Sequence, residues 1–242
     1  MKNIITIFVA TLFISSTLYA CDGCKKYNND NFKIKKVSVT HNSSISSTIW
    51  EIKVSGNAGE TTPKPVGQLN GAPVLGYVFP TSLKPTDVGF NQTDGIVALA
   101  LTSHPDFDDT PLWDENNDND YANDGIIWHP HWVILTEDDR VGGGLSVKQF
   151  NKDDKSVILP PTNPGMPMYM DSPGFQVTTK GNTITVVVPD YRMNNQIDFN
   201  YDGVACYMQV NTEMKDKPML GVYTVYSVAS GDLSLPYKVK KK

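Results

Sequence analysis

The chain contains no lysine or arginine between Lys84 and Arg140, and its basic residues gather near the two ends. A formal net charge of −5, with an acidic middle, excludes nucleic acid as a partner and makes cations the expected partners of that middle. After residue 20 the chain also lacks any apolar run near the roughly 20 residues that a membrane-spanning helix needs. Apart from a lipid anchor, nothing in the sequence predicts contact with a membrane.

Residues 1–20 have the pattern of a secretory signal peptide. Lys2 begins the segment, an apolar stretch covers 4–14, and a small residue precedes Cys21. Residues 18–21 also resemble the lipobox of bacterial lipoproteins, so the sequence leaves open whether the leader is simply removed or Cys21 is lipidated. In both cases we expect export across the inner membrane, to the periplasm or the outer cell surface.

Cysteine is scarce, because the chain has only Cys21, Cys24 and Cys206. If Cys21 carries lipid, Cys24 and Cys206 remain as a candidate disulfide pair, which an oxidising compartment permits. If it does not, Cys21 and Cys24 form a CxxC motif. A redox role for that motif lacks the surrounding βαβ pattern that such a role requires.

Helical periodicity is also missing, and alternating β-branched segments replace it. The expected strands cover 32–39, 49–54, 74–79, 96–102, 126–135, 145–150, 156–159, 174–179, 183–188, 203–210 and 222–228. Many short strands between turn residues predict an all-β fold, an antiparallel β-sandwich with long metal-binding loops. We expect a polar tether over 21–31 and a single domain over 32–242, with long loops at 104–125 and 160–173.

Histidine is rare, yet three of the four histidines lie between residues 104 and 132. In a strand, His129-Pro-His131 would point both imidazoles to one face, about 6.5 to 7 Å apart along the chain. Trp128 and Trp132 would then back the site from the other face. With His104 as a third imidazole, the pattern predicts a transition-metal site, provided that His104 folds back onto the His129 strand.

Three neutral nitrogens suit copper or zinc, and the sequence does not separate these metals. Alternating Met166, Met168 and Met170 favour copper slightly, because thioethers prefer Cu(I), although the pattern fits adaptable loop-packing residues better. A blue-copper site is not expected, since no histidine follows Cys206.

An acidic loop provides a second cation signal. Oxygen ligands stand at alternate positions, as in the first part of an EF-hand, although Asn119 replaces the turn glycine and Gly125 replaces the bidentate glutamate. The expected calcium ligands are Asp114, Asn116, Asp118, Asp120 and Asp124, with Asp106, Asp108 and Asp109 as auxiliary candidates. Calcium would order the loop and hold His104 near the other histidines.

Two other classes of function remain open. The first is a zinc hydrolase or hydratase that uses the same histidines, with Asp106 or Asp108 as the base or a further ligand. His129-Pro-His131-Trp132 resembles the ligand strand of α-class carbonic anhydrases, but no later histidine can serve as that family's third ligand. The second class is an adhesion or assembly domain of the cell envelope that only calcium stabilises.

Three runs resemble one family of metal-binding proteins: SHPDFDDTPLWDEN at 103–116, NDG at 123–125 and WHPHW at 128–132. The resemblance is to the copper-repressible surface copper-binding proteins of methanotrophs. It implies a secreted, β-rich protein that holds one copper ion through two histidines and a kynurenine made from tryptophan, in some members with calcium.

This resemblance implies specific roles for residues of the middle third. His131 would be a copper ligand, and His129 stands where the modified aromatic would lie, with Trp128 and Trp132 beside it. A later histidine of the family is missing here, which leaves His104 as its substitute. The combined prediction is a secreted protein that captures or buffers copper and has no catalytic residue.

Overall fold

The computed structural model describes residues 21, 23–110 and 114–242, so the signal-peptide prediction lies outside the described residues. The predicted all-β class is confirmed, because the regular secondary structure of the described residues is strands apart from five short 3-10 helices. These helices are η1 (Cys24–Tyr27), η2 (Asp30–Phe32), η3 (Pro85–Val88), η4 (Tyr121–Asn123) and η5 (Asp190–Met193). No helix in the part of the chain that the structure describes is both long and apolar enough to cross a membrane.

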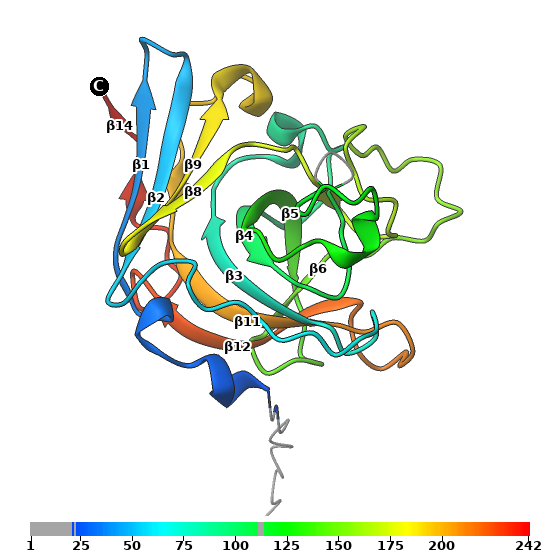
Figure 1. The fold of residues 1–242 in the computed structure, drawn as a ribbon. Helices are drawn as coiled ribbons and strands as arrows, with labels where there is room; N and C mark the ends of the chain where they lie inside the picture. Colours follow the sequence, from blue (N-terminus) through cyan, green and yellow to red (C-terminus); the bar gives the residue numbers. More distant parts are fainter. Residues whose placement is uncertain (1–20, 22, 111–113) are drawn as a thin grey trace, which may run out of the picture.

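The larger sheet curls into a closed barrel (Figure 1). Its strands follow the order β4-β3-β11-β12-β6-β5-β7, and an additional pairing of β4 with β5 closes the ring. The bounds are β3 (Pro73–Pro80), β4 (Ile96–Ser103), β5 (His129–Glu137), β6 (Leu145–Val147), β7 (Met170–Asp171), β11 (Val204–Val210) and β12 (Leu220–Val228). All pairings within this sheet are antiparallel.

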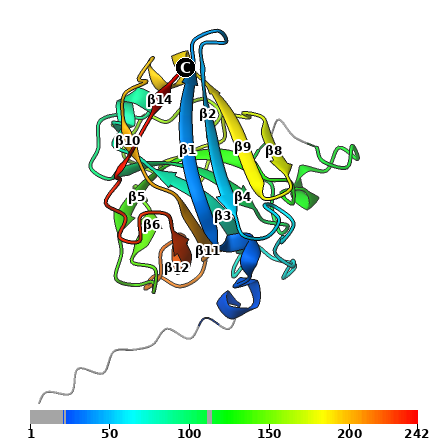
Figure 2. The same cartoon turned by 90° about the vertical axis from the view of Figure 1, so that its left-hand side faces the viewer.

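A five-stranded sheet covers one side of the barrel, as the view of Figure 2 shows. Its order is β14-β1-β2-β9-β8, with a parallel pairing only between β1 and β14. The bounds are β1 (Ile34–Asn42), β2 (Ser47–Val54), β8 (Val177–Lys180), β9 (Thr183–Pro189) and β14 (Lys240–Lys241), and a separate pair joins β10 (Asn200–Tyr201) to β13 (Tyr237–Lys238).

Strand alternation divides the apolar side chains between two cores. On β3, Tyr77 and Phe79 face outward into the core shared with the five-stranded sheet, whereas Val78 faces the barrel interior. Trp50 of β2 anchors the shared core, and its ring packs edge-on against Phe79 at 5.3 Å between centroids. The barrel therefore keeps an interior of its own, separate from the core between the sheets.

Most strand predictions are confirmed to within a few residues, because the alternating pattern follows burial directly. The hairpin of β8 and β9 turns tightly, since Lys180 pairs with Thr183. The strand predicted at 156–159 is wrong: this segment is turn and irregular structure on the surface.

The segment expected as a tether packs against the domain instead. Tyr27 is buried and stacks on Tyr207 at 6.0 Å between ring centroids. Cys24 is bonded to Cys21, whereas Cys206 is a free thiol that lines the barrel cavity. The predicted Cys24–Cys206 disulfide is therefore wrong, because the two side chains belong to different cores. Lipidation of Cys21 stays a prediction, and it would need the sulfur that this disulfide uses.

Candidate metal centre

Two adjacent barrel strands bring the three histidines together. On β5, His129 and His131 are two residues apart, so their side chains share the inner face. Thr102 of β4 lies opposite His129 in the register, and His104 follows at the end of β4. The backbone N–H of His104 donates to Gly125 O at 2.7 Å, which holds the chain at this point. The expected fold-back of His104 onto the His129 strand is thus present.

Asp109 completes the group from a turn that follows His104. The Nδ1 atom of His104 lies 2.9 Å from Phe107 O, which curls the segment back toward the histidines. Asp109 Oδ1 then lies 3.4 Å from the Nε2 of His104, 3.3 Å from that of His129 and 3.4 Å from that of His131. The four ligand atoms all lie within 4.8 Å of one another.

The three distances from Asp109 Oδ1 match the edges of a coordination tetrahedron. Metal–ligand bonds of about 2.0 to 2.1 Å give a regular tetrahedron with edges of about 3.3 to 3.4 Å. A square-planar ion would instead place one imidazole opposite Asp109, about 4 Å from its oxygen. The His104 to His129 edge is shorter, at 2.8 Å between Nε2 atoms. The four residues could thus hold one ion, and tetrahedral coordination would require the separations among the imidazole nitrogens, now between 2.8 Å and at most 4.8 Å, to become more even.

Hydrogen bonds fix the imidazoles with their Nε2 atoms toward the centre. The Nδ1 atoms of His104 and His129 lie 2.9 and 2.6 Å from the carbonyl oxygens of Phe107 and Ile127. Because a carbonyl only accepts, these Nδ1 atoms carry the protons. Two Nε2 lone pairs then face each other at 2.8 Å, and a proton or a metal ion must lie between them. His131 Nδ1 lies 3.0 Å from Ser172 Oγ.

Burial makes the centre costly unless a cation occupies it. All four side chains are at most 6% exposed. Asp109 Oδ1 and His131 Nε2 have no hydrogen-bond partner, although each is aimed at the common point. Burial raises the pKa of Asp109, but His131 and His104 outweigh burial and hold the pKa well below the ordinary value. Burial lowers the pKa of His131 to about 3, although Asp109 opposes the shift. The group is therefore prepared to coordinate an ion.

The structure corrects the roles expected for Asp106, Asp108 and Asp109. Asp109 belongs to the histidine centre rather than to a calcium site. Asp106 Oδ1 instead accepts hydrogen bonds from the backbone N–H groups of Val66 and Gly67. Asp108 Oδ1 accepts from Thr110, so neither Asp106 nor Asp108 joins the converging ligand atoms as the hydrolase alternative expected.

Trp128 and Trp132 lie on the face of the strand opposite the histidines, as expected. Trp132 is buried in the core between the sheets, where its ring meets Trp50 at 5.9 Å between centroids. Trp128 packs on Tyr77 and donates from Nε1 to Gly59 O. Both tryptophans thus lie where strand alternation predicts them, and the modified aromatic that the family resemblance implies stays a prediction.

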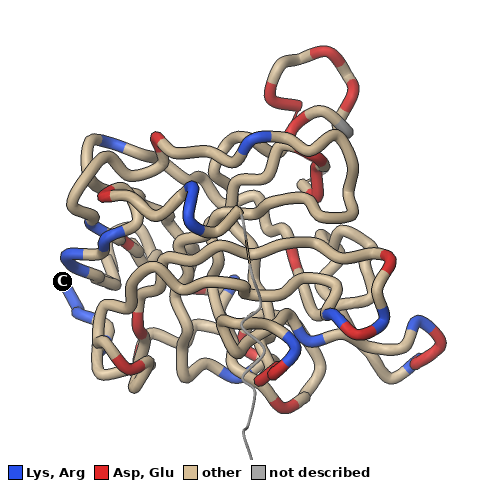
Figure 3. Tube along the Cα trace, turned by 90° about the horizontal axis from the view of Figure 1, so that it is seen from below, with Lys and Arg blue, Asp and Glu red and all other residues tan. Residues whose placement is uncertain are grey.

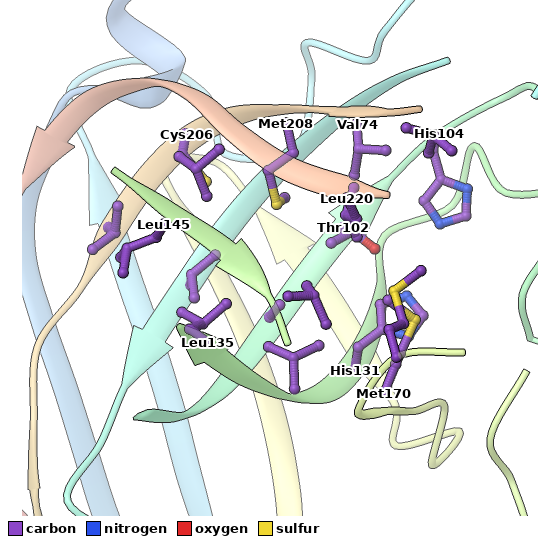
Figure 4. Close-up of a pocket in the computed structure, with 18 of the residues that line it drawn as sticks. Val74, Thr102, His104, His131, Leu135, Leu145, Met170, Cys206, Met208 and Leu220 are labelled. Carbon is purple, nitrogen blue, oxygen red and sulfur yellow. The ribbon is translucent and has the colours of Figure 1, made fainter. Parts of the chain in front are cut away.

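The three methionines do gather at one place, as their alternation predicts. Met166, Met168 and Met170 all line a cavity inside the barrel that His131 also lines. Figure 4 shows Met170 beside His131 at one end of this cavity. Cys206 lines the same cavity, and burial raises the pKa of its thiol to about 12, so the thiol stays protonated.

The acidic loop projects from the body without a basic residue (Figure 3). Its carboxylates cap backbone N–H groups, as in Asx-turns. Asp114 accepts from the backbone N–H groups of Asp118 and Asn119. Asp118 in turn accepts from Asp120 N, and Asp124 from Glu115 N.

The expected calcium ligands are not among the groups whose ligand atoms converge in the described residues, so the calcium site stays a prediction. They are Asp114, Asn116, Asp118, Asp120 and Asp124. Among the described residues, the histidine centre is the one group of three or more His, Cys, Asp or Glu whose ligand atoms converge. Hydrogen bonds from backbone N–H groups to the carboxylates hold this loop in the structure.

Gly125 joins the loop to the centre. Its backbone N–H donates to Glu115 Oε1 at 3.0 Å, and its carbonyl accepts from His104 N. Its φ is +100°, and an added Cβ would lie 2.2 Å from His104 O and 2.9 Å from His104 Nδ1. Only glycine fits at this position.

Comparisons with protein-family models, with curated proteins and with solved structures find no match to this chain. The resemblance to copper-binding surface proteins therefore stays a prediction. What the geometry defines is a β-barrel protein with a buried His/Asp group that could bind a metal ion.

Proposed function

We propose that this exported protein captures and holds a single transition-metal ion at the cell envelope, through His104, Asp109, His129 and His131. One observation carries the proposal: Asp109 Oδ1 lies nearly equidistant from the three Nε2 atoms, at tetrahedral edge lengths. Zinc(II) fits this set best, because it prefers tetrahedral nitrogen and oxygen ligands at these bond lengths.

Copper is the second candidate, and the adjoining methionines favour it. Met166, Met168 and Met170 supply thioethers to the cavity beside the centre, and thioethers suit Cu(I). The Asp109 carboxylate argues the other way, since it is a hard ligand. Copper(II) binds such sites more tightly than zinc(II) in general, but it favours a tetragonal geometry. A competition experiment with zinc and copper would show which of the two metals the protein binds more tightly.

Holding an ion fits the centre better than hydrolysis. Hydrolytic zinc sites use three protein ligands and keep the fourth position for water. Here Asp109 fills the fourth position. A zinc hydratase or esterase would gain support if the zinc-loaded protein hydrated carbon dioxide or cleaved an ester, and if His131→Ala removed that activity.

Metal analysis of loaded and desalted protein tests the proposal. We expect one ion per chain in the wild type and none in a His129→Ala, His131→Ala double variant. His41→Ala is the matched control, because His41 pairs with Asp190 outside the centre and its loss should leave the metal content unchanged. An unchanged metal content in the double variant would overturn the proposal.

A further inference from the structure

The closed barrel contains a cavity of about 50 Å³ that ends at the metal centre. Figure 4 shows His104, His131 and Met170 at one end, with Cys206 and Leu145 at the other. Apart from sulfur atoms, its walls are hydrocarbon except at four residues: Thr102, His104, Asp109 and His131. Three of these four belong to the centre, so the polar part of the wall is the centre itself.

The lining also shows which side of the centre faces the cavity. His104, Asp109 and His131 line it, whereas His129 does not. In a tetrahedron, three ligands define the face opposite the fourth. The face that is turned to the barrel interior is therefore the one opposite His129, through which a fifth ligand would approach an ion.

The chemistry of the walls selects the ligand. A buried water needs two to four polar partners, and the valine, leucine and methionine side chains that form most of the wall supply none. A bound ion would occupy the ligand atoms of His104, Asp109 and His131 at the polar end. Apolar cavities of about 150 Å³ hold benzene or xenon, so a cavity of about a third of that volume suits a smaller molecule.

We propose that the barrel interior binds a small apolar molecule of the size of dioxygen, against the His104–Asp109–His131 face of the centre. The cavity itself does not require the metal. Only the contact with an ion depends on the proposed function.

Xenon tests the cavity directly. Crystals of the zinc-loaded protein under xenon pressure should show one anomalous xenon site among the cavity side chains. In Ala100→Leu the added side chain should fill the space and remove the xenon, with the zinc content unchanged. Val187→Leu, which adds bulk at an exposed position of β9, should keep both. A wild-type barrel without xenon would overturn the proposal, and so would undiminished xenon in a folded Ala100→Leu protein.

A second measurement tests the contact between xenon and the centre. It does not depend on whether Ala100→Leu folds. The relaxation of ¹²⁹Xe should be faster in protein loaded with paramagnetic cobalt(II) than in protein loaded with zinc(II). Equal relaxation rates in the two loaded proteins would overturn the placement against the centre. Xenon in the barrel of a protein that retains no metal would support the cavity while overturning the proposed function, so the two failures are distinguishable.

Discussion

The histidine centre and the acidic loop are neighbours in the chain and both contain many cation ligands, yet only the centre brings them to one point. At the centre, two paired strands and a short turn fix where each side chain points. In the loop, each carboxylate can reach a nearby backbone N–H and accepts from it. The comparison teaches that ligand density alone does not make a metal site, because local backbone donors compete with the cation.

Removal of the metal should give the largest difference between the two regions. An ion present at 1,000 times its Kd stabilises the fold by about 4 kcal/mol. For a domain of this size that corresponds to a loss of roughly 8 to 16 °C in Tm on chelation. Zinc added back should restore the Tm, whereas calcium added to the metal-free protein should leave it unchanged. A rise with calcium alone would restore the calcium interpretation of the loop.

The same substitution, Asp to Asn, should lower metal affinity at the centre and leave it unchanged in the loop. Asp109→Asn keeps the shape of the side chain but removes the charge, so we expect metal affinity to fall by more than about 100-fold, beyond the usual effect of an outer partner. Asp118→Asn, in the loop, should leave the affinity unchanged. Competition with a chromophoric chelator measures both, and equal affinities in the two variants would contradict the assignment of Asp109.

The hydroxyl of Ser172 should have a smaller effect, because it touches the metal only through His131. Partners that orient a ligating imidazole contribute about 10-fold or more to metal affinity. We therefore expect Ser172→Ala to weaken binding roughly 10-fold. Ser156→Ala is the matched control, since the exposed Ser156 hydroxyl donates a hydrogen bond to Asp154 at the surface. No change in Ser172→Ala relative to this control would show that the contact does not orient the ring.

The smallest expected effect concerns titration within the loop. A hydrogen bond from the Asn123 side chain lowers the pKa of Asp118 below its ordinary value of 3.8. Because the folded pKa is depressed, this bond supports the loop above about pH 3.8 and is lost as the pH falls through the folded value. In an NMR titration, Asn123→Ala should raise the Asp118 midpoint, while Asp154 titrates as before. An unmoved Asp118 midpoint would mean that other contacts control it.

Much of the fold could be predicted because alternation records burial directly. On β5, the pattern places His131 and Trp132 on opposite faces, and the structure does the same. Closure of the barrel could not be predicted, because it depends on the pairing of β4 with β5 across a long loop. No pattern within either strand encodes that pairing.

The metal centre could be predicted only in part from the sequence, for the same reason. The pair His129 and His131 follows from strand geometry, and His104 was expected to join it. The fourth ligand was not resolved, because Asp106, Asp108 and Asp109 are equivalent in composition and differ only in how the turn after His104 aims them. Ser172 carried no signal, since it approaches His131 from 41 residues away in the chain.

The close contacts around Gly125 make the base of the acidic loop less tolerant of sequence change than its tip. Any side chain at this residue would displace His104, so the base of the loop cannot drift without damage to the centre. The exposed tip, between Glu115 and Asp124, is held by its own hydrogen bonds and has no such constraint. We expect evolutionary variation and tolerated insertions to concentrate at the tip, which also makes it a suitable place for an engineered epitope or label.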